Sequence, residues 1–407
     1  MGLFESMKIN LLYYLFFVSI LPNQINVNIF IHGTIKPFLK ARNIATILGQ
    51  DVLNTPYASF NKFMRKSDYL KKYQAVQELG LKKIDLDKME PGNGAAAIAN
   101  LYSFFEDAPS IFYTFGWSGL LSYKIREETA LDLYNQIDQL VNELKNEGYN
   151  PKINLITYSH GGTVALNIGK VAPPNQHKIN LITLGMPVQK DTDHLCDSPI
   201  FENIYHFYST SDYVQPIDHT SSEFFSCHRK FHTRKDFVVP NKLKQIKIGV
   251  IKTALNTKKH NKKCPPESLI KKGYHQNPGH SELWILGWSA SGYRKDYPLY
   301  PMPIVVFTPL LTRYIDKFNA ITDMAIDINP LQEEIVVSDL HSGTSETEPF
   351  ITYEQFQALK SEFLRFFTPN VDLKDLKQKT RKAAQKYAFF KHDPCNKLNY
   401  CPDRNQQ

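Results

Sequence analysis

Short runs of apolar, mostly β-branched or aromatic residues recur along 25–251, separated by segments long enough to hold a helix. These runs have little polar alternation, which is typical of strands covered on both faces, as in a parallel sheet. The pattern predicts six core strands, at 25–31, 111–115, 153–157, 179–184, 203–209 and 245–251.

The pentapeptide Ile-Asn-Leu-Ile-Thr occurs twice, at 153–157 and at 179–183, in two consecutive predicted strands. The segment between the copies leaves room for a crossover helix, so we expect parallel pairing with right-handed connections. Helical periodicity is present at 38–48 and at 126–144. The sequence therefore predicts an α/β fold, with a mostly parallel sheet flanked by helices.

Two connections between the predicted strands, 50–110 and 220–244, are longer than ordinary loops. Both would leave the sheet near its carboxyl edge, where open α/β sheets carry their binding sites. They are interpreted either as lid-like insertions over an apolar pocket or as ordinary surface insertions.

Past Tyr293 the pattern changes, and we interpret 293–407 as a C-terminal α+β appendage packed on a domain formed by 24–292. No motif in this extension indicates a function. Its predicted elements are two strands, an exposed loop and two amphipathic helices, at 298–311, 333–337, 341–349, 353–367 and 371–391.

The amino end has Lys8 followed by an almost uninterrupted apolar run over 9–21. The run is too short to span a bilayer comfortably, and with its basic flank it is typical of a secretory signal. No pair of small residues marks a cleavage site, so 1–22 is predicted to be a signal peptide or an uncut membrane anchor. A buried leading strand is the alternative. The chain is therefore expected to be exported, as a secreted, periplasmic or membrane-anchored protein.

The composition is that of a globular protein, with 407 residues of which 42% are hydrophobic. The net charge of +8 is concentrated in 228–263, where twelve Lys and Arg residues accompany one acid, Asp236. This segment is predicted to meet an anionic membrane surface, or else to be a solvated lysine-rich loop and strand. No nucleic-acid-binding motif accompanies the charge, so nucleic acid is not expected as a partner.

The five cysteines leave the redox compartment open, because an odd number cannot all pair within one chain. Cys196 and Cys227 could form a staple around the turn between them, and Cys395 and Cys401 could close a small loop. No Cys-x-x-Cys sequence or Cys/His cluster is present, so the sequence predicts no metal ligand set.

The predicted strand over 153–157 stops at Ser159, and two glycines and a helical segment follow. A serine at such a bend would expose its hydroxyl at the carboxyl end of the sheet, beside the N–H of His160. Residues 157–161, Thr-Tyr-Ser-His-Gly, resemble the G-x-S-x-G nucleophile elbow of the α/β-hydrolase family and look closest to its lipase and esterase branch. Thr157 departs from that pattern, because it replaces the first glycine.

The resemblance implies a triad in the chain order serine, acid, histidine. Asp212 lies in the turn after the predicted strand over 203–209 and is the leading candidate for the acid, with Asp218 in reserve. His280, on a Pro- and Gly-rich loop before an apolar helical segment, is the candidate base, and His275 is its nearest rival.

An acyl-transfer site also needs hydrogen-bond donors for the oxyanion. The family's His-Gly pattern is present at His32 and Gly33, so the resemblance assigns the donors to the backbone N–H groups of Thr34 and His160, while His32 holds the loop. The expected function is hydrolysis of a carboxylic ester, with lipid esters favoured, by Ser159, His280 and Asp212, which requires no cofactor. The alternatives are a thioesterase or amidase of the same fold, or an inactive hydrolase-like binding module at a membrane.

Overall fold

The computed structural model describes most of the chain between residues 23 and 366. The predicted leader, the predicted helix over 38–48, Asp218, and Cys264, Cys395 and Cys401 lie outside the described residues. The described ranges are 23–35, 56–67, 78–87, 93–173, 177–215, 226–252, 274–284, 297–318 and 322–366, with isolated positions at 70, 71, 76, 222, 224, 375, 378, 379 and 382.

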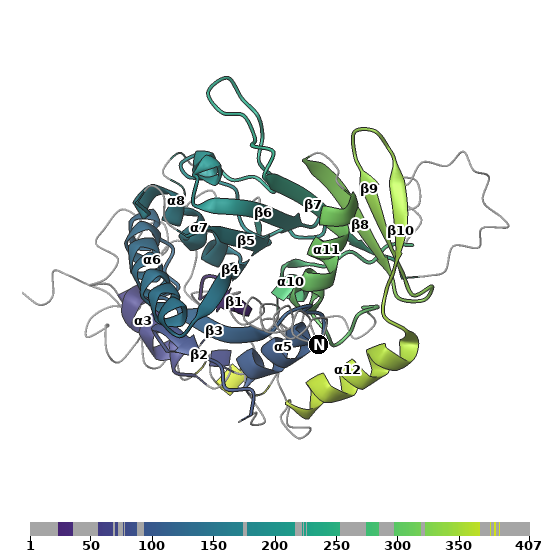
Figure 1. Cartoon of the computed structure of the whole chain (residues 1–407), viewed down its shortest axis with the longest axis horizontal. Helices are drawn as coiled ribbons and strands as arrows, with labels where there is room; N and C mark the ends of the chain where they lie inside the picture. The colour runs from purple at the N-terminus through teal and green to yellow at the C-terminus, as the bar shows by residue number, and fades with distance from the viewer. Residues whose placement is uncertain are drawn as a thin grey trace, which may run out of the picture.

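A single ten-stranded sheet runs through the described part of the chain, in the order β10-β9-β8-β7-β6-β5-β4-β1-β3-β2 (Figure 1). All six predicted core strands are confirmed and pair with one another in parallel. They are β1 (Asn23–Ile31), β3 (Ser110–Gly116), β4 (Tyr149–Tyr158), β5 (Ile179–Leu184), β6 (Phe201–Tyr208) and β7 (Leu243–Val250).

The two Ile-Asn-Leu-Ile-Thr copies lie side by side and in register on β4 and β5, so that each residue faces its own counterpart. Their asparagines belong to a ladder of side-chain amides across four strands. Asn154 donates to Asn28 at 2.9 Å, Asn180 donates to Asn154 at 3.1 Å, and Asn203 donates to Asn180 at 3.1 Å. The ladder gives hydrogen-bond partners to buried side-chain amides, whose burial without partners would be costly. It also fixes the register of the four strands relative to one another.

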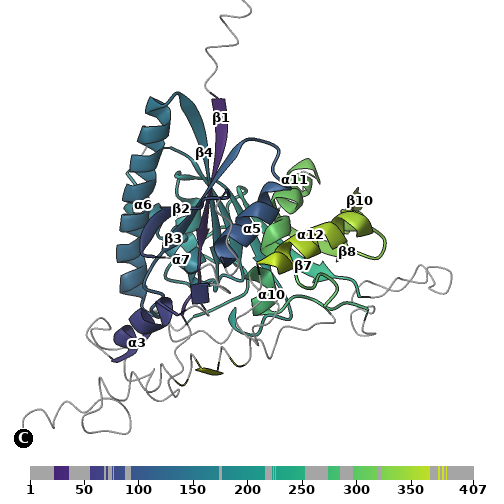
Figure 2. The same cartoon turned by 90° about the horizontal axis from the view of Figure 1, so that it is seen from below.

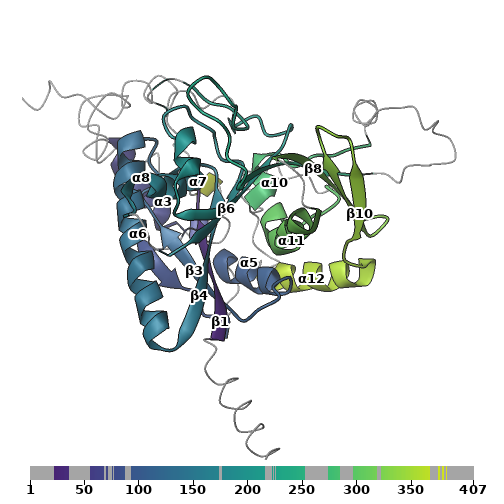
Figure 3. The ribbon, with the colours of Figure 1, turned by 45° about the horizontal axis from the view of Figure 1, so that its top comes forward.

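Helices cover both faces of the sheet, which confirms the predicted α/β class (Figures 2 and 3). One face packs against α6 (Tyr123–Asn146), which contains the helix predicted over 126–144, and against α7 (His160–Leu166) and α8 (Ile168–Val171). The other face packs against α5 (Gly94–Ser103), α10 (His280–Trp284), η5 (Ile304–Phe307), α11 (Thr308–Phe318) and α12 (Tyr353–Arg365).

The segment 50–110 differs from the predicted lid-like insertion over much of its described length. Its strand β2 (Gly80–Lys83) pairs antiparallel with β3 at the edge of the sheet, and α5 lies in the core. The alanines of α5 lack the large apolar side chains that mark a core helix in a sequence, yet small side chains allow a helix to pack closely against a sheet. The segment also contains α3 (Pro56–Arg65). In the second predicted insertion, 226–242 forms loops with isolated bridges and no helix.

The region after residue 297 continues the sheet instead of forming an appendage packed on it. Strand β8 (Asp323–Asn329), which the sequence analysis missed, pairs in parallel with β7. Strands β9 (Glu334–Asp339) and β10 (Ser345–Pro349) follow in antiparallel order, so the loop predicted over 341–349 is partly an edge strand.

The strand predicted over 298–311 is wrong, because η5 and α11 occupy most of it. Residues 304–307 are buried on all sides, so their pattern has no periodicity that separates a strand from a helix. In contrast, α12 begins where the sequence predicted, because Thr352 and Gln355 form a capping box.

The predicted staple between Cys196 and Cys227 is also wrong, because the two buried thiols form no disulfide with each other. The Cys227 thiol instead donates to the Gln215 carbonyl at 2.6 Å. Within the described residues, the helices lack the combination of length and apolar character needed to cross a membrane.

We expect Asn180→Ala to lower the free energy of unfolding by about 1–3 kcal/mol, because it leaves the buried Asn154 amide oxygen without its donor. Urea unfolding of the purified protein measures the change. Asn142→Ala is the control, since its amide reaches only Asp138 on the exposed face of α6, at 3.4 Å. Equal, small effects of the two substitutions would contradict a stabilising role for the ladder.

Candidate active site

Ser159 lies at the sharp turn between β4 and α7, in a backbone conformation that residues other than glycine rarely adopt. Its φ is 51° and its ψ is −130°. A conformation of this kind costs about 1–3 kcal/mol and persists only where the surroundings hold it. Here the Ser159 N–H donates to the Leu184 carbonyl at 3.0 Å, and the Ser159 carbonyl accepts from the Gly162 N–H at 2.9 Å. The turn is therefore held from both sides.

Two glycines allow the chain to pack closely around this turn. A Cβ on Gly33 would lie 2.8 Å from the Ser159 Cβ, and one on Gly161 would lie 2.6 Å from the His32 carbonyl oxygen. The end of β1 and the start of α7 can therefore touch only because both residues lack side chains. Thr157 occupies the first glycine position of the resembled pattern, and its buried hydroxyl donates to the Ile182 carbonyl at 3.1 Å. The departure from the pattern thus creates no unpaired polar group.

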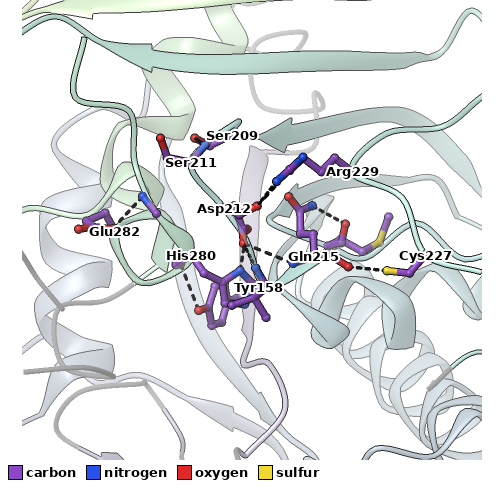
Figure 4. A network of polar contacts seen from close by, with 12 residues as sticks. Tyr158, Ser209, Ser211, Asp212, Gln215, Cys227, Arg229, His280 and Glu282 are labelled. Carbon is purple, nitrogen blue, oxygen red and sulfur yellow. Dashed lines mark hydrogen bonds and ion pairs between the residues drawn. The ribbon is translucent and has the colours of Figure 1, made fainter. Parts of the chain in front are cut away.

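Asp212 and His280 form a direct hydrogen bond, as the sequence predicted, with the carboxylate Oδ2 2.7 Å from the imidazole Nδ1 (Figure 4). Asp212 is fully buried, and the His280 side chain is 10% exposed. Because an ionised carboxylate only accepts, His280 Nδ1 carries the proton, and in the neutral ring Nε2 is left as an acceptor. That is the tautomer a general base requires.

Asp212 is itself held by several further hydrogen bonds. Its second carboxylate oxygen accepts from the Val214 N–H at 2.9 Å, and its carbonyl accepts from Arg229 Nε at 3.0 Å and Nη2 at 2.8 Å. Figure 4 shows the Arg229 guanidinium reaching Asp212 from the side away from His280. The sequence analysis missed this role of Arg229, because nothing in the sequence links a residue of the basic segment to the acid turn.

Tyr158 packs against the His280 imidazole and binds the His280 backbone. The two rings lie 4.7 Å apart, and the Tyr158 hydroxyl donates to the His280 carbonyl at 3.1 Å. Burial, with smaller contributions from the Asp212 and Glu282 carboxylates, raises the Tyr158 pKa well above its usual value, so the phenol stays a donor. Tyr158 in turn stacks on Trp284 at 5.5 Å. The sequence analysis assigned no role to Tyr158.

Ser159 and the Asp212–His280 pair meet at the turn after β5. Gly185 follows Leu184, whose carbonyl binds Ser159, and has φ 62°. A Cβ there would lie 3.0 Å from the Asp212 carboxylate and 3.1 Å from His280 Nδ1. Among the contacts of these described residues, none joins the Ser159 hydroxyl to His280. The structure thus brings the acid and histidine into contact and binds the Ser159 backbone to Leu184, the residue just before Gly185.

The rival histidine has a different partner. His275 Nε2 lies 3.5 Å from a carboxylate oxygen of Asp327 on β8, and residue 275 bridges to Ile251. Of the two candidates, only His280 contacts Asp212.

The predicted oxyanion donors flank the serine in the chain. Thr34 follows Gly33, and its buried hydroxyl has no hydrogen-bond partner among the described residues. His160 is the first residue of α7 and is buried. His32 is buried and holds the loop by hydrogen bonds, as predicted, with its Nδ1 2.7 Å from the Gly33 carbonyl oxygen.

The basic segment uses several of its described charges within the protein. Besides Arg229, Lys230 pairs with Asp323 at 3.1 Å, Arg234 pairs with Asp193, and Lys242 donates to the Ser198 carbonyl at 2.6 Å. A membrane-binding role for 228–263 stays a prediction. Within the described ranges, the His, Cys, Asp and Glu side chains form no group of three or more that could hold a metal ion.

The sequence matches no protein-family model, and the comparison with curated proteins finds no match. The chemistry of the site is therefore interpreted from its own geometry.

We expect the His280 Nδ1 proton to give a low-field NMR resonance, because it lies in a short, buried hydrogen bond to a carboxylate. The resonance should vanish in His280→Gln and remain in His275→Gln, the matched control. Its survival in His280→Gln would mean that another group produces it.

Proposed function

We propose that this protein is a serine hydrolase of the α/β-hydrolase type that cleaves carboxylic esters, with lipid esters as the first candidates. The observation that carries the proposal is the Asp212–His280 hydrogen bond beside a serine held at a strained strand-to-helix turn. Such a constellation follows the nucleophile, base and orienting acid of known serine hydrolases.

In the proposed reaction, the Ser159 oxygen attacks the acyl carbonyl carbon while His280 Nε2 takes the hydroxyl proton. The new C–O bond gives a tetrahedral oxyanion. When the bond to the alcohol breaks, the imidazolium returns the proton to the leaving oxygen and an acyl-enzyme remains. A water molecule then attacks the acyl-enzyme carbonyl carbon and loses a proton to His280. The bond to the Ser159 oxygen breaks, the proton returns to that oxygen, and the acid and the free serine are released.

Three features of the site favour this chemistry. The buried Asp212 carboxylate stabilises the imidazolium that forms during each proton transfer, and Arg229 and Tyr158 restrict the movement of the pair. The N–H groups of Thr34 and His160 would receive the oxyanion. The missing Ser159–His280 hydrogen bond is compatible with the proposal, because catalytic hydrogen bonds are often long before substrate binds.

The choice of a lipid ester rests on the resemblance of 157–161 to the lipase and esterase branch. Thioesters and amides would use the same three groups, since a fold that serves many reactions does not fix the acyl donor. An inactive, membrane-bound module is the alternative from another class.

We expect Ser159→Ala to lower ester turnover by at least about a thousandfold, because only the oxyanion donors and substrate binding would remain. Hydrolysis of p-nitrophenyl esters and labelling by a fluorophosphonate probe measure the loss. Ser211→Ala is the control, because Ser211 lies on the Asp212 turn and its backbone N–H, not its hydroxyl, donates to Ser209 Oγ. A wild-type protein that neither labels nor hydrolyses any ester of the panel would favour the binding module.

We also expect kcat/KM to rise with acyl chain length, because each methylene group buried in an apolar pocket contributes about 0.8 kcal/mol. A series of p-nitrophenyl esters from acetate to palmitate measures this preference. A maximum at acetate would contradict the lipid-ester assignment while leaving the hydrolase mechanism in place.

A further inference from the structure

His32 is fully buried at the end of β1, and both of its ring nitrogens have partners. Nδ1 lies 2.7 Å from the carbonyl oxygen of Gly33. Nε2 lies 3.1 Å from Arg65 Nη1 and accepts more weakly from the Trp117 backbone N–H at 3.4 Å. Arg65 is the last residue of α3, which belongs to the segment predicted to be a lid.

The identity of these partners determines the tautomer of His32. The Gly33 carbonyl can only accept a hydrogen bond, so Nδ1 must carry the proton. A guanidinium can only donate, so Nε2 must be the acceptor. Burial and the positive charge of Arg65 lower the pKa of His32 to about 3, which leaves the ring neutral near pH 7.

The Nδ1 hydrogen bond fixes the peptide unit that carries the proposed oxyanion donor. In a trans peptide the carbonyl and the following N–H point in opposite directions. Anchoring the Gly33 carbonyl on His32 therefore directs the Thr34 N–H away from His32. The same peptide begins at Gly33, whose missing Cβ would lie 2.8 Å from the Ser159 Cβ.

Several contacts hold Arg65 in this position. It donates to the Trp117 carbonyl, while the Trp117 indole N–H donates to the His32 carbonyl at 2.7 Å and the Trp117 ring stacks on His32 at 5.8 Å. A Cβ on Gly116 would lie 2.8 Å from Arg65 Nη2, so the guanidinium enters where β3 has no side chain. The guanidinium is buried, and this burial lowers the pKa of Arg65 to about 10, so it still carries its charge at pH 7.

We propose that Arg65 is a positioning residue for the oxyanion hole: by donating to His32 Nε2, it selects the His32 tautomer that holds the Gly33–Thr34 peptide with its N–H available to the Ser159 oxyanion. The proposal rests on the proposed hydrolase function. It gives Arg65, which belongs to the segment 50–110, a role in positioning the oxyanion-hole peptide instead of a role in a lid over the site.

With the opposite tautomer, an Nδ1 lone pair would face the Gly33 carbonyl oxygen. The two acceptors would repel each other, and the peptide would turn or shift to relieve the contact. Loss of one oxyanion donor typically lowers kcat by about 10²–10³-fold. The effect on KM should be small, because this donor acts mainly on the transition state.

Two substitutions of His32 separate its two nitrogens. His32→Asn places an amide N–H near the position of Nδ1, and His32→Gln places one near the position of Nε2. We expect His32→Gln to lose about a hundredfold in kcat and in affinity for an alkylboronic acid, a tetrahedral analogue. Both kcat and the affinity for the boronic acid should be at least tenfold higher in His32→Asn than in His32→Gln. Urea unfolding identifies conditions in which both variants are folded.

Arg65→Leu tests directly whether the Arg65–His32 hydrogen bond positions the Gly33–Thr34 peptide. Arg313→Leu is the matched control. Arg313 also caps a carbonyl, that of Phe105, but it lies on α11, away from the serine turn. Arg65→Leu should lower kcat and boronic acid affinity as His32→Gln does, whereas Arg313→Leu should leave both within about twofold. The ¹⁵N shifts of His32 should report a protonated Nδ1 in the wild type and a mixture of tautomers in Arg65→Leu.

Equal kcat values for the wild type, His32→Gln and Arg65→Leu would overturn the proposal, and so would a wild-type His32 protonated at Nε2. These outcomes differ from a failure of the hydrolase function. A wild type that shows no ester turnover and no fluorophosphonate labelling overturns the function and removes the oxyanion role of Arg65. The tautomer measurement still reports whether Arg65 controls His32.

Discussion

The parallel pairing of β4 between β1 and β5 is the constraint on which the candidate site depends. Parallel strands end at the same edge of a sheet, so the turns that follow β1, β4, β5 and β6 are brought together although they are far apart in the sequence. These turns supply Gly33, Ser159, Gly185 and Asp212. A change in register of one strand would move its turn along the sheet and separate these groups.

Buried polar contacts hold this arrangement at both ends of the strands. Nearer the amino ends, the asparagine ladder crosses β1, β4, β5 and β6. At the carboxyl ends, Asp212 and His32 are buried with charged or polar partners. The strained Ser159 turn lies between β1 and β5 and is held by their glycines and carbonyls. The backbone strain is thus located where hydrogen bonds and close packing hold the turn.

The sequence was a good guide to local structure and a poor guide to long-range partners. Core strands were predictable because burial on both faces gives continuous apolar runs, and α12 was predictable from its amphipathic pattern. The analysis missed β8 and misread 298–311, because alternation in a short strand and burial around a short helix give weak patterns. It also missed the roles of Arg65 and Arg229, since a guanidinium that caps a distant carbonyl has no fixed spacing from its partner.

The sequence by itself determined the six core strands and the turn at Ser159, because each depends on a local pattern, and the family resemblance indicated the pairing of Asp212 with His280. Only the tertiary structure decided that His275 faces Asp327, that 323–349 extends the same sheet and that Arg65 reaches His32. These contacts join segments that approach one another only after the sheet has formed. Their distances depend on strand order and helix packing, which residue spacing does not encode.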